Sequence, residues 1–156
     1  MTKSTSLALD QKDLDTILVI DFGSQYTQLI ARRVRELDVF SEILPWDISP
    51  EKIKDLNPAG IILSGGPESV TVSNTPRIPE IVFDLDVPIL GICYGMQTLA
   101  EQFGGQVTSS KAKEFGHAEI VIEETSVLFE GFSSGSSIDV WMSHGDHVST
   151  LPDKFK

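Results

Sequence analysis

The sequence has little cysteine, little positive charge and no long apolar run. Its 156 residues include one cysteine, so no disulfide can form within the chain, which suits a reducing compartment. Twelve Lys and Arg oppose 23 Asp and Glu, and the net charge of −11 disfavours nucleic acid and anionic membranes as partners. No stretch approaches the ~18 apolar residues of a membrane helix, and residues 1–13 lack an apolar signal core. These absences predict a soluble cytoplasmic protein with no nucleic-acid or membrane partner.

The chain does contain enough apolar residues, 40%, for the core of one domain. Short apolar runs that suit buried strands alternate with stretches that suit helices. The order predicts an α/β fold with a doubly wound, mainly parallel sheet flanked by helices. The predicted strands are residues 16–22, 39–46, 59–64 and 88–92, and the predicted helices are residues 23–37, a segment from 49, 78–85 and 94–103.

The two ends of the chain differ from this regular middle. Residues 1–15 lack periodicity and are predicted to be a flexible leader before a domain at 16–156. Short antiparallel strands are predicted toward the C-terminus, with a serine-rich hairpin loop at 133–137. These short strands are residues 106–110, 119–124 and 138–142. In the first helix, one side is expected to be apolar, with Leu29, Ile30, Val34 and Leu37, and the other charged, with Arg32, Arg33, Arg35 and Glu36.

Cys93 follows the predicted strand 88–92 directly and precedes a predicted helix. The string Gly-Ile-Cys-Tyr-Gly is typical of a nucleophile elbow, whose turn is too tight for side chains at Gly91 and Gly95. The first N–H groups of the helix would favour a thiolate and could hold an oxyanion. The alternative is an inert core cysteine, the usual state of a lone thiol, and the two glycines argue against it.

Two more loops follow predicted parallel strands and should reach the same edge of the sheet. One is residues 21–25, and the other is the Ser-Gly-Gly-Pro string at 64–67. Its glycines would let backbone N–H groups approach a substrate carbonyl, although a simple tight turn is the alternative. Residues 21–25 match neither a dinucleotide-binding nor a Walker A motif, so nucleotide binding by this loop is not predicted.

A thiol nucleophile needs a base, commonly histidine, and the chain has three. His117 precedes Glu119 by two residues, a spacing that strands produce by chance, so a surface or packing role is favoured. His144 and His147 are expected in a polar loop after a strand, either as a capped turn or as a substrate-contacting loop. The pattern alone assigns no base.

Four strings together resemble the class I (Cys-His-Glu triad) glutamine amidotransferases, in the family's order and over nearly the whole chain. They are Asp-Phe-Gly-Ser-Gln-Tyr at 21–26, Ser-Gly-Gly-Pro-Glu-Ser at 64–69, Gly-Ile-Cys-Tyr-Gly-Met-Gln at 91–97 and Val-Trp-Met-Ser-His-Gly-Asp at 140–146. The match is closest to the amidotransferase domains of GMP synthetases. The resemblance implies a flavodoxin-like fold and glutamine as the substrate.

The same resemblance implies roles for individual residues. Cys93 would attack the side-chain amide of glutamine and release ammonia through a glutamyl thioester. The N–H groups of Gly66 and Tyr94 would stabilise the oxyanion. The residues that match glutamine-holding positions, partly through main-chain atoms, are Gln97, Ser143 and His144.

The family's catalytic His and Glu stand in a His-Pro-Glu string downstream of residues 143–146, and the 156 residues contain no such string. We therefore expect a C-terminally truncated amidotransferase portion that is nearly inactive alone. No metal or cofactor is expected in this portion. ATP and Mg²⁺ would serve a separate synthetase domain that uses the ammonia to convert XMP to GMP, and the full-length protein would be a homodimer.

Two alternatives to this enzyme remain at this point. The chain could be a non-catalytic amidotransferase-like binding or regulatory module, in which Cys93 is incidental. It could also be a cysteine variant of an α/β-hydrolase, which fits the elbow but not the short length.

Overall fold

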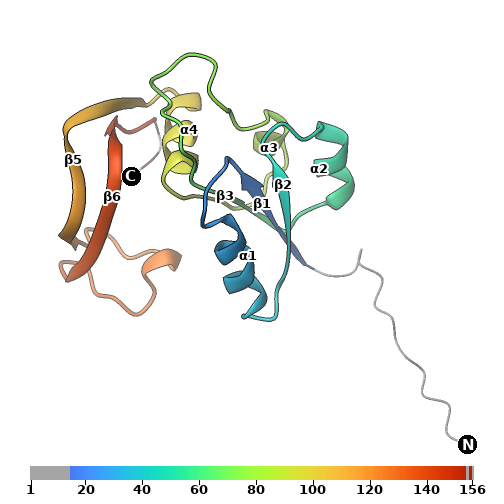
Figure 1. Ribbon diagram of the computed structural model, residues 1–156. Helices are drawn as coiled ribbons and strands as arrows, with labels where there is room; N and C mark the ends of the chain where they lie inside the picture. The colour runs from blue at the N-terminus through green and yellow to red at the C-terminus, as the bar shows by residue number, and fades with distance from the viewer. Residues whose placement is uncertain (1–14, 154, 156) are drawn as a thin grey trace, which may run out of the picture. The chain divides into compact units, whose positions relative to one another are not determined.

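The structure is a computed structural model that describes residues 15–153 and 155, without the side chains of 110–115 and 144. The predicted leader at 1–15 lies outside the described residues except for Asp15. The chain divides into two compact units (Figure 1). The described residues up to Val107, with those from Val148 onward, make the first unit, and Thr108–His147 make the second.

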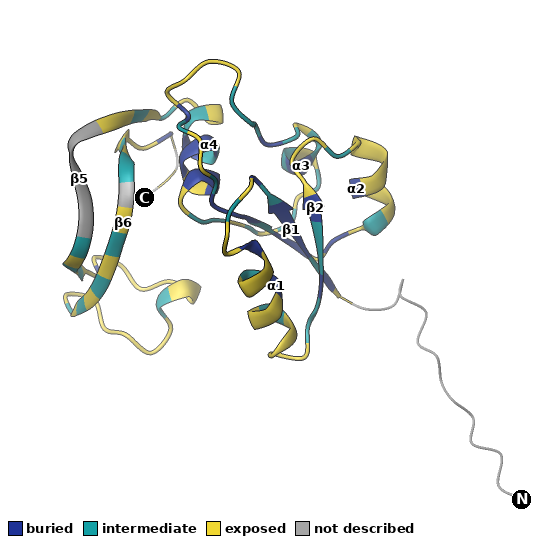
Figure 2. Cartoon of the chain, in the orientation of Figure 1, coloured by how far each residue is buried: buried dark blue, intermediate teal, exposed yellow. Residues whose placement is uncertain are grey.

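The first unit is built on a parallel sheet of four strands in the order β2-β1-β3-β4. These strands are β1 (Thr16–Asp21), β2 (Phe40–Pro45), β3 (Gly60–Leu63) and β4 (Ile89–Gly91). Three successive residues of β1, Leu18, Val19 and Ile20, have no exposed surface, so this strand is covered on both faces (Figure 2). The predicted parallel sheet is confirmed.

The helices of the first unit are α1 (Thr27–Arg35), α2 (Pro50–Leu56), α3 (Ile81–Asp84) and α4 (Tyr94–Gln102). The buried Ile53 of α2 and Val82 of α3 join Leu18 and Ile20 in one hydrophobic core. Helices therefore flank the sheet as the alternating pattern predicts, and α4 begins directly at the predicted elbow.

The expected apolar side of α1 is correct only in part, since Ile30 and Val34 are half-buried. Leu29 and Leu37 are 45% and 77% exposed, whereas Thr27 and Ala31 are buried. The predicted helix began at residue 23, but residues 24–26 form the turn that leads into α1. The buried face is set by contact with β2, where the Ser41 hydroxyl donates to the Ala31 carbonyl over 3.0 Å.

Beyond α4, two strands form a separate sheet, β5 (Gln106–Val121) and β6 (Ser137–Thr150). Their cross-strand bonds run in opposite sequence directions, as in Thr108 with His147 and His117 with Asp139, so the strands are antiparallel. Two corrections follow. The predicted strand at 106–110 continues to Val121, and residues 143–147 lie inside β6, not in a loop. A turn precedes β6, where the Ser136 N–H donates to the Ser133 carbonyl.

Candidate active site

Cys93 stands between β4 and α4 in a strained, solvent-exposed turn. Its backbone has φ 49° and ψ −114°, a conformation that residues with side chains rarely adopt and that marks functional turns. A Cβ atom added to Gly91 would lie 2.6 Å from the Met96 Cα, and one added to Gly95 would lie 2.5 Å from the Leu63 carbonyl oxygen. Neither position accepts a side chain, which confirms the predicted elbow.

The elbow is fixed to the end of the neighbouring strand β3 by main-chain hydrogen bonds. The Ile92 N–H donates to the Leu63 carbonyl over 2.9 Å, and the Gly95 N–H donates to the Ser64 carbonyl over 3.0 Å. These bonds lie on either side of Cys93, so the turn is held at both ends while the thiol side remains exposed.

The Ser-Gly-Gly-Pro loop after β3 lies beside the cysteine. A Cβ atom added to Gly65 would lie 3.5 Å from the Cys93 Cβ and 3.5 Å from the Ser24 Oγ. One added to Gly66 would lie 2.7 Å from the Phe22 carbonyl oxygen. The three loops that follow β1, β3 and β4 therefore meet at one edge of the sheet, as predicted from their positions in the sequence.

Two backbone donors belong to the segments that meet here, Gly66 in the loop after β3 and Tyr94 at the start of α4. Among the residues that the structure describes, neither the Gly66 N–H nor the Tyr94 N–H donates a hydrogen bond. The Tyr94 N–H is at the first position of α4, where helix geometry leaves donors without partners. Both groups are thus available to an acceptor, the property that an oxyanion hole requires.

The Tyr94 side chain anchors the start of α4. It is 2% exposed, its ring centroid lies 5.4 Å from that of Phe22, and its hydroxyl donates to the Pro76 carbonyl. The aromatic contact and the hydrogen bond hold the helix N-terminus from two directions. The backbone N–H of Tyr94 is consequently placed by a buried side chain.

Sequence reasoning missed two polar side chains that organise these loops. Asp21 Oδ1 accepts hydrogen bonds from the Gly23 N–H (2.8 Å) and from the Thr27 hydroxyl (2.7 Å), which fixes the turn into α1. The hydroxyl of buried Ser64 accepts from the Phe22 N–H over 3.0 Å. The only signal in the sequence was the position of each residue, at the end of a buried strand and before a glycine-containing turn.

The predicted site residues divide between the two units. Cys93, Gly66, Tyr94 and Gln97 belong to the first unit, where Gln97 lies on α4 and is 5% exposed. The other two predicted residues, Ser143 and His144, belong to the second unit and lie on β6, with Ser143 exposed. The roles of all six residues remain predictions.

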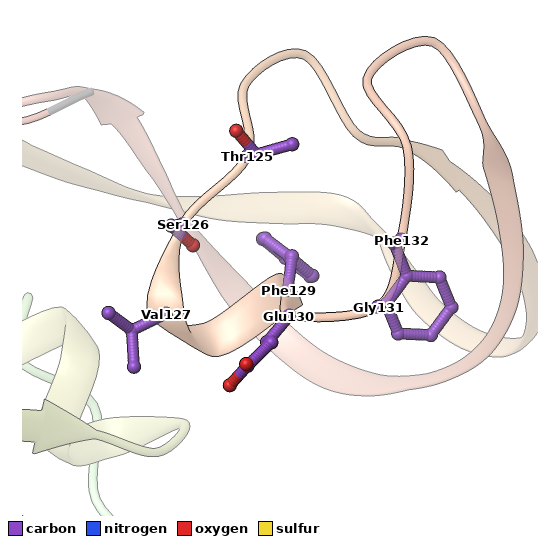
Figure 3. A pocket seen from close by; sticks show the side chains of 7 residues that line it. All are labelled: Thr125, Ser126, Val127, Phe129, Glu130, Gly131 and Phe132. Atoms are coloured by element: carbon purple, nitrogen blue, oxygen red, sulfur yellow. The ribbon is translucent and has the colours of Figure 1, made fainter.

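The other histidines and a pocket also belong to the second unit. His117 Nε2 lies 2.9 Å from Asp139 Oδ1 in an exposed pair, which agrees with the surface role favoured for it. A pocket of about 510 Å³ lies at the 3₁₀ turn η2 (Val127–Phe129), and its lining residues include no cysteine or histidine (Figure 3). Its lining residues are Thr125, Ser126, Val127, Phe129, Glu130, Gly131 and Phe132.

The described residues contain neither a cluster of metal ligands nor a helix that could span a membrane. Nowhere in 15–153 or at 155 do three or more His, Cys, Asp or Glu gather as metal ligands could. Within the same residues, every helix is too short or too polar to cross a bilayer.

Comparison with known proteins gives three kinds of match. The family model "Glutamine amidotransferase class-I" matches residues 18–156. GMP synthases [glutamine-hydrolyzing] of Photorhabdus laumondii and Colwellia psychrerythraea are 54% and 58% identical over 145 residues, 89% of this chain. The chain spans 28% of the length of these relatives.

The structural match agrees with the sequence matches. A crystal structure of a Thermoplasma acidophilum protein, assigned as one subunit of a GMP synthase, superposes with a TM-score of 0.73 at 35% identity. The match covers 92% of this chain and 71% of that one. With the cysteine elbow and the two free N–H groups beside it, these matches establish that the chain belongs to the class-I glutamine amidotransferase family.

Proposed function

We propose that this chain is the glutamine-hydrolysing portion of a GMP synthase and releases ammonia through a thioester on Cys93. The observation that carries the proposal is the geometry around this residue: an exposed cysteine in a strained elbow, beside the free N–H groups of Gly66 and Tyr94. The names of relatives at 54–58% identity support glutamine as the substrate.

In the proposed reaction, the Cys93 sulfur attacks the side-chain carbonyl carbon of glutamine. The carbonyl oxygen becomes an oxyanion and accepts hydrogen bonds from the Gly66 and Tyr94 N–H groups. The carbon–nitrogen bond then breaks as the nitrogen takes up a proton, which leaves ammonia and a γ-glutamyl thioester. Water attacks the thioester, and the products are glutamate and the regenerated thiol.

The remaining predicted residues would hold the substrate. Gln97, Ser143 and His144 would bind glutamine, partly through main-chain atoms. The 156 residues contain no His-Pro-Glu string to supply the family's base, so we propose that they turn over glutamine slowly by themselves. In the whole protein, a homodimer in the cytoplasm, the ammonia would serve an ATP- and Mg²⁺-dependent conversion of XMP to GMP, with no cofactor in the present portion.

Competitive alkylation tests the substrate site without requiring turnover. A chloromethyl ketone analogue of glutamine should alkylate Cys93 at least about a hundredfold faster than iodoacetamide, because binding would position its carbonyl. Free glutamine should protect the thiol, and the Cys93→Ala variant should take up neither reagent. Similar rates for the two reagents, without protection by glutamine, would favour a non-catalytic binding module.

Ammonia release from glutamine tests the need for a further base. We expect slow release that disappears in Cys93→Ala, since losing a base costs about three orders of magnitude or more in comparable nucleophile–base pairs. Rapid release that depends on Cys93 would show that the chain supplies its own base. His117 and His144 would then be the first histidines to replace.

A further inference from the structure

Ser64 connects the three loops of the site through its main chain. Its N–H donates to the Ile20 carbonyl of β1 over 3.0 Å, and its carbonyl accepts from the Gly95 N–H of α4 over 3.0 Å. Its side chain has no exposed surface. The buried hydroxyl has two close partners: it accepts from the Phe22 N–H over 3.0 Å and donates to the Gly65 carbonyl over 2.8 Å.

The second of these bonds acts on the peptide group that carries an oxyanion donor. The Gly65 carbonyl and the Gly66 N–H belong to one planar peptide, and the described residues contain no cis peptide, so the two groups point in opposite directions. Any bond that fixes the carbonyl direction therefore also fixes the direction of the N–H. Glycine on both sides gives this peptide more rotational freedom than other residue pairs would.

Packing alone does not remove that freedom. Gly66 lies against Phe22, where an added Cβ would be 2.7 Å from the carbonyl oxygen, so the position of its Cα is restricted. Rotation of the Gly65–Gly66 peptide about the line between its two Cα atoms leaves the Gly66 Cα in place, so this contact changes little. The other acceptor near the Ser64 hydroxyl, Asp21 Oδ1 at 3.5 Å, is more distant and already receives bonds from Gly23 and Thr27.

We propose that Ser64 is a positioning residue, whose hydroxyl keeps the Gly65–Gly66 peptide from rotating so that the Gly66 N–H stays directed for the oxyanion. The inference rests on the proposed function, because that function assigns the oxyanion to Gly66 and Tyr94. Ser64 acts through the peptide and touches neither the substrate nor the sulfur. Its loss should therefore slow only reactions that develop charge on a carbonyl oxygen.

Two reagents separate this role from a general effect on the thiol. The chloromethyl ketone analogue of glutamine places a carbonyl in the oxyanion hole, whereas iodoacetamide alkylates Cys93 by direct displacement and needs no such hole. In Ser64→Ala, we expect the rate of alkylation by the chloromethyl ketone to fall about 10- to 100-fold. This decrease does not exceed the decrease in rate caused by removing a whole oxyanion-hole donor. The iodoacetamide rate should change less than about twofold.

Matched variants complete the experiment. Ser73→Ala removes an exposed hydroxyl from the same β3–α3 connection and should leave both rates unchanged. Ser64→Thr keeps the hydroxyl and should retain most of the chloroketone rate. If Ser64→Ala does not fold, Ser64→Cys keeps a weaker donor and should slow the chloroketone about threefold to tenfold. Peptide mass mapping would confirm Cys93 as the alkylated residue.

The outcomes distinguish a failure of the Ser64 role from a failure of the proposed function on which it rests. Equal slowing of both reagents in Ser64→Ala, or no slowing of either, would overturn the positioning role. A wild-type chain that shows no preference for the chloroketone would overturn the proposed function itself. A selective loss in Ser64→Ala, absent in Ser73→Ala, would support both.

Discussion

The first unit is built around a packed apolar core, whereas the described part of the second unit has almost none. In the first, Leu18, Ile20 and Leu63 have no exposed surface and belong to a core that includes Tyr94 at the site. Among the described residues of the second, Ile122 is the single buried hydrophobic side chain, and Trp141 is 77% exposed. The elbow thus stands on a packed sheet, whereas Ser143 stands on a two-stranded ribbon.

Under the proposed function, the chemistry falls to the first unit. The proposed acylation requires sub-ångström placement of Cys93 and of the Gly66 and Tyr94 N–H groups, and all three lie in the packed unit. Variants at buried positions of the first unit should therefore change stability or chemistry strongly, and variants at exposed positions of the second should change stability little.

The largest effect is expected at Gly95. An alanine Cβ would lie 2.5 Å from the Leu63 carbonyl oxygen in a central strand, so Gly95→Ala should lower the free energy of unfolding by about 3 kcal/mol. Gly145 in the second unit has no atom within 4 Å of an added Cβ, and Gly145→Ala should change stability by less than about 0.5 kcal/mol. Urea unfolding measures both variants, and equal stability would remove the contrast between the units.

Tyr94→Phe should have an intermediate effect. Losing the hydroxyl that donates to the Pro76 carbonyl should cost about 1 kcal/mol of unfolding free energy. The ring contact with Phe22 remains, so the chloroketone rate at Cys93 should fall less than about threefold. Tyr26→Phe is the control, because that side chain is 67% exposed. If Tyr94→Phe matched this control in stability, the phenol would not anchor α4.

The sequence was most informative where the structure depends on neighbours along the chain. Continuous apolar runs predicted β1 and β3, and two glycines around one cysteine predicted the elbow, because strand burial and turn geometry are local. The Ser64 hydroxyl could not be placed, since its bond to the Phe22 N–H joins residues 42 positions apart.

The errors have the same origin. Helical spacing grouped Leu29 and Leu37 on the apolar side of α1, but both are exposed. Spacing alone does not show which stripe of a helix packs on the sheet. The strand β6 continues through polar residues 143–147 because its pairing with β5 determines its length. Cross-strand partners far apart in sequence leave little signal in either strand.

Ser143→Ala should weaken substrate binding without changing stability. Its side chain is exposed on β6, so the unfolding free energy should stay within about 0.5 kcal/mol of wild type. Glutamine protection of Cys93 against iodoacetamide should require about threefold to tenfold more glutamine if the hydroxyl contributes a bond. Ser137→Ala, on the same strand, should need the same glutamine concentration as wild type for protection. Unchanged protection in Ser143→Ala would break the assignment of substrate contacts to this side chain.

The smallest effect is expected for His117→Ala. His117 and Asp139 form a pair with 66% and 76% of their side chains exposed, so solvent weakens their interaction and its loss should cost less than about 0.5 kcal/mol. Slow ammonia release and the chloroketone rate should both remain at wild-type values. Asp139→Asn tests the same pair from β6 and should behave alike. Loss of ammonia release in His117→Ala alone would instead identify this histidine as a base.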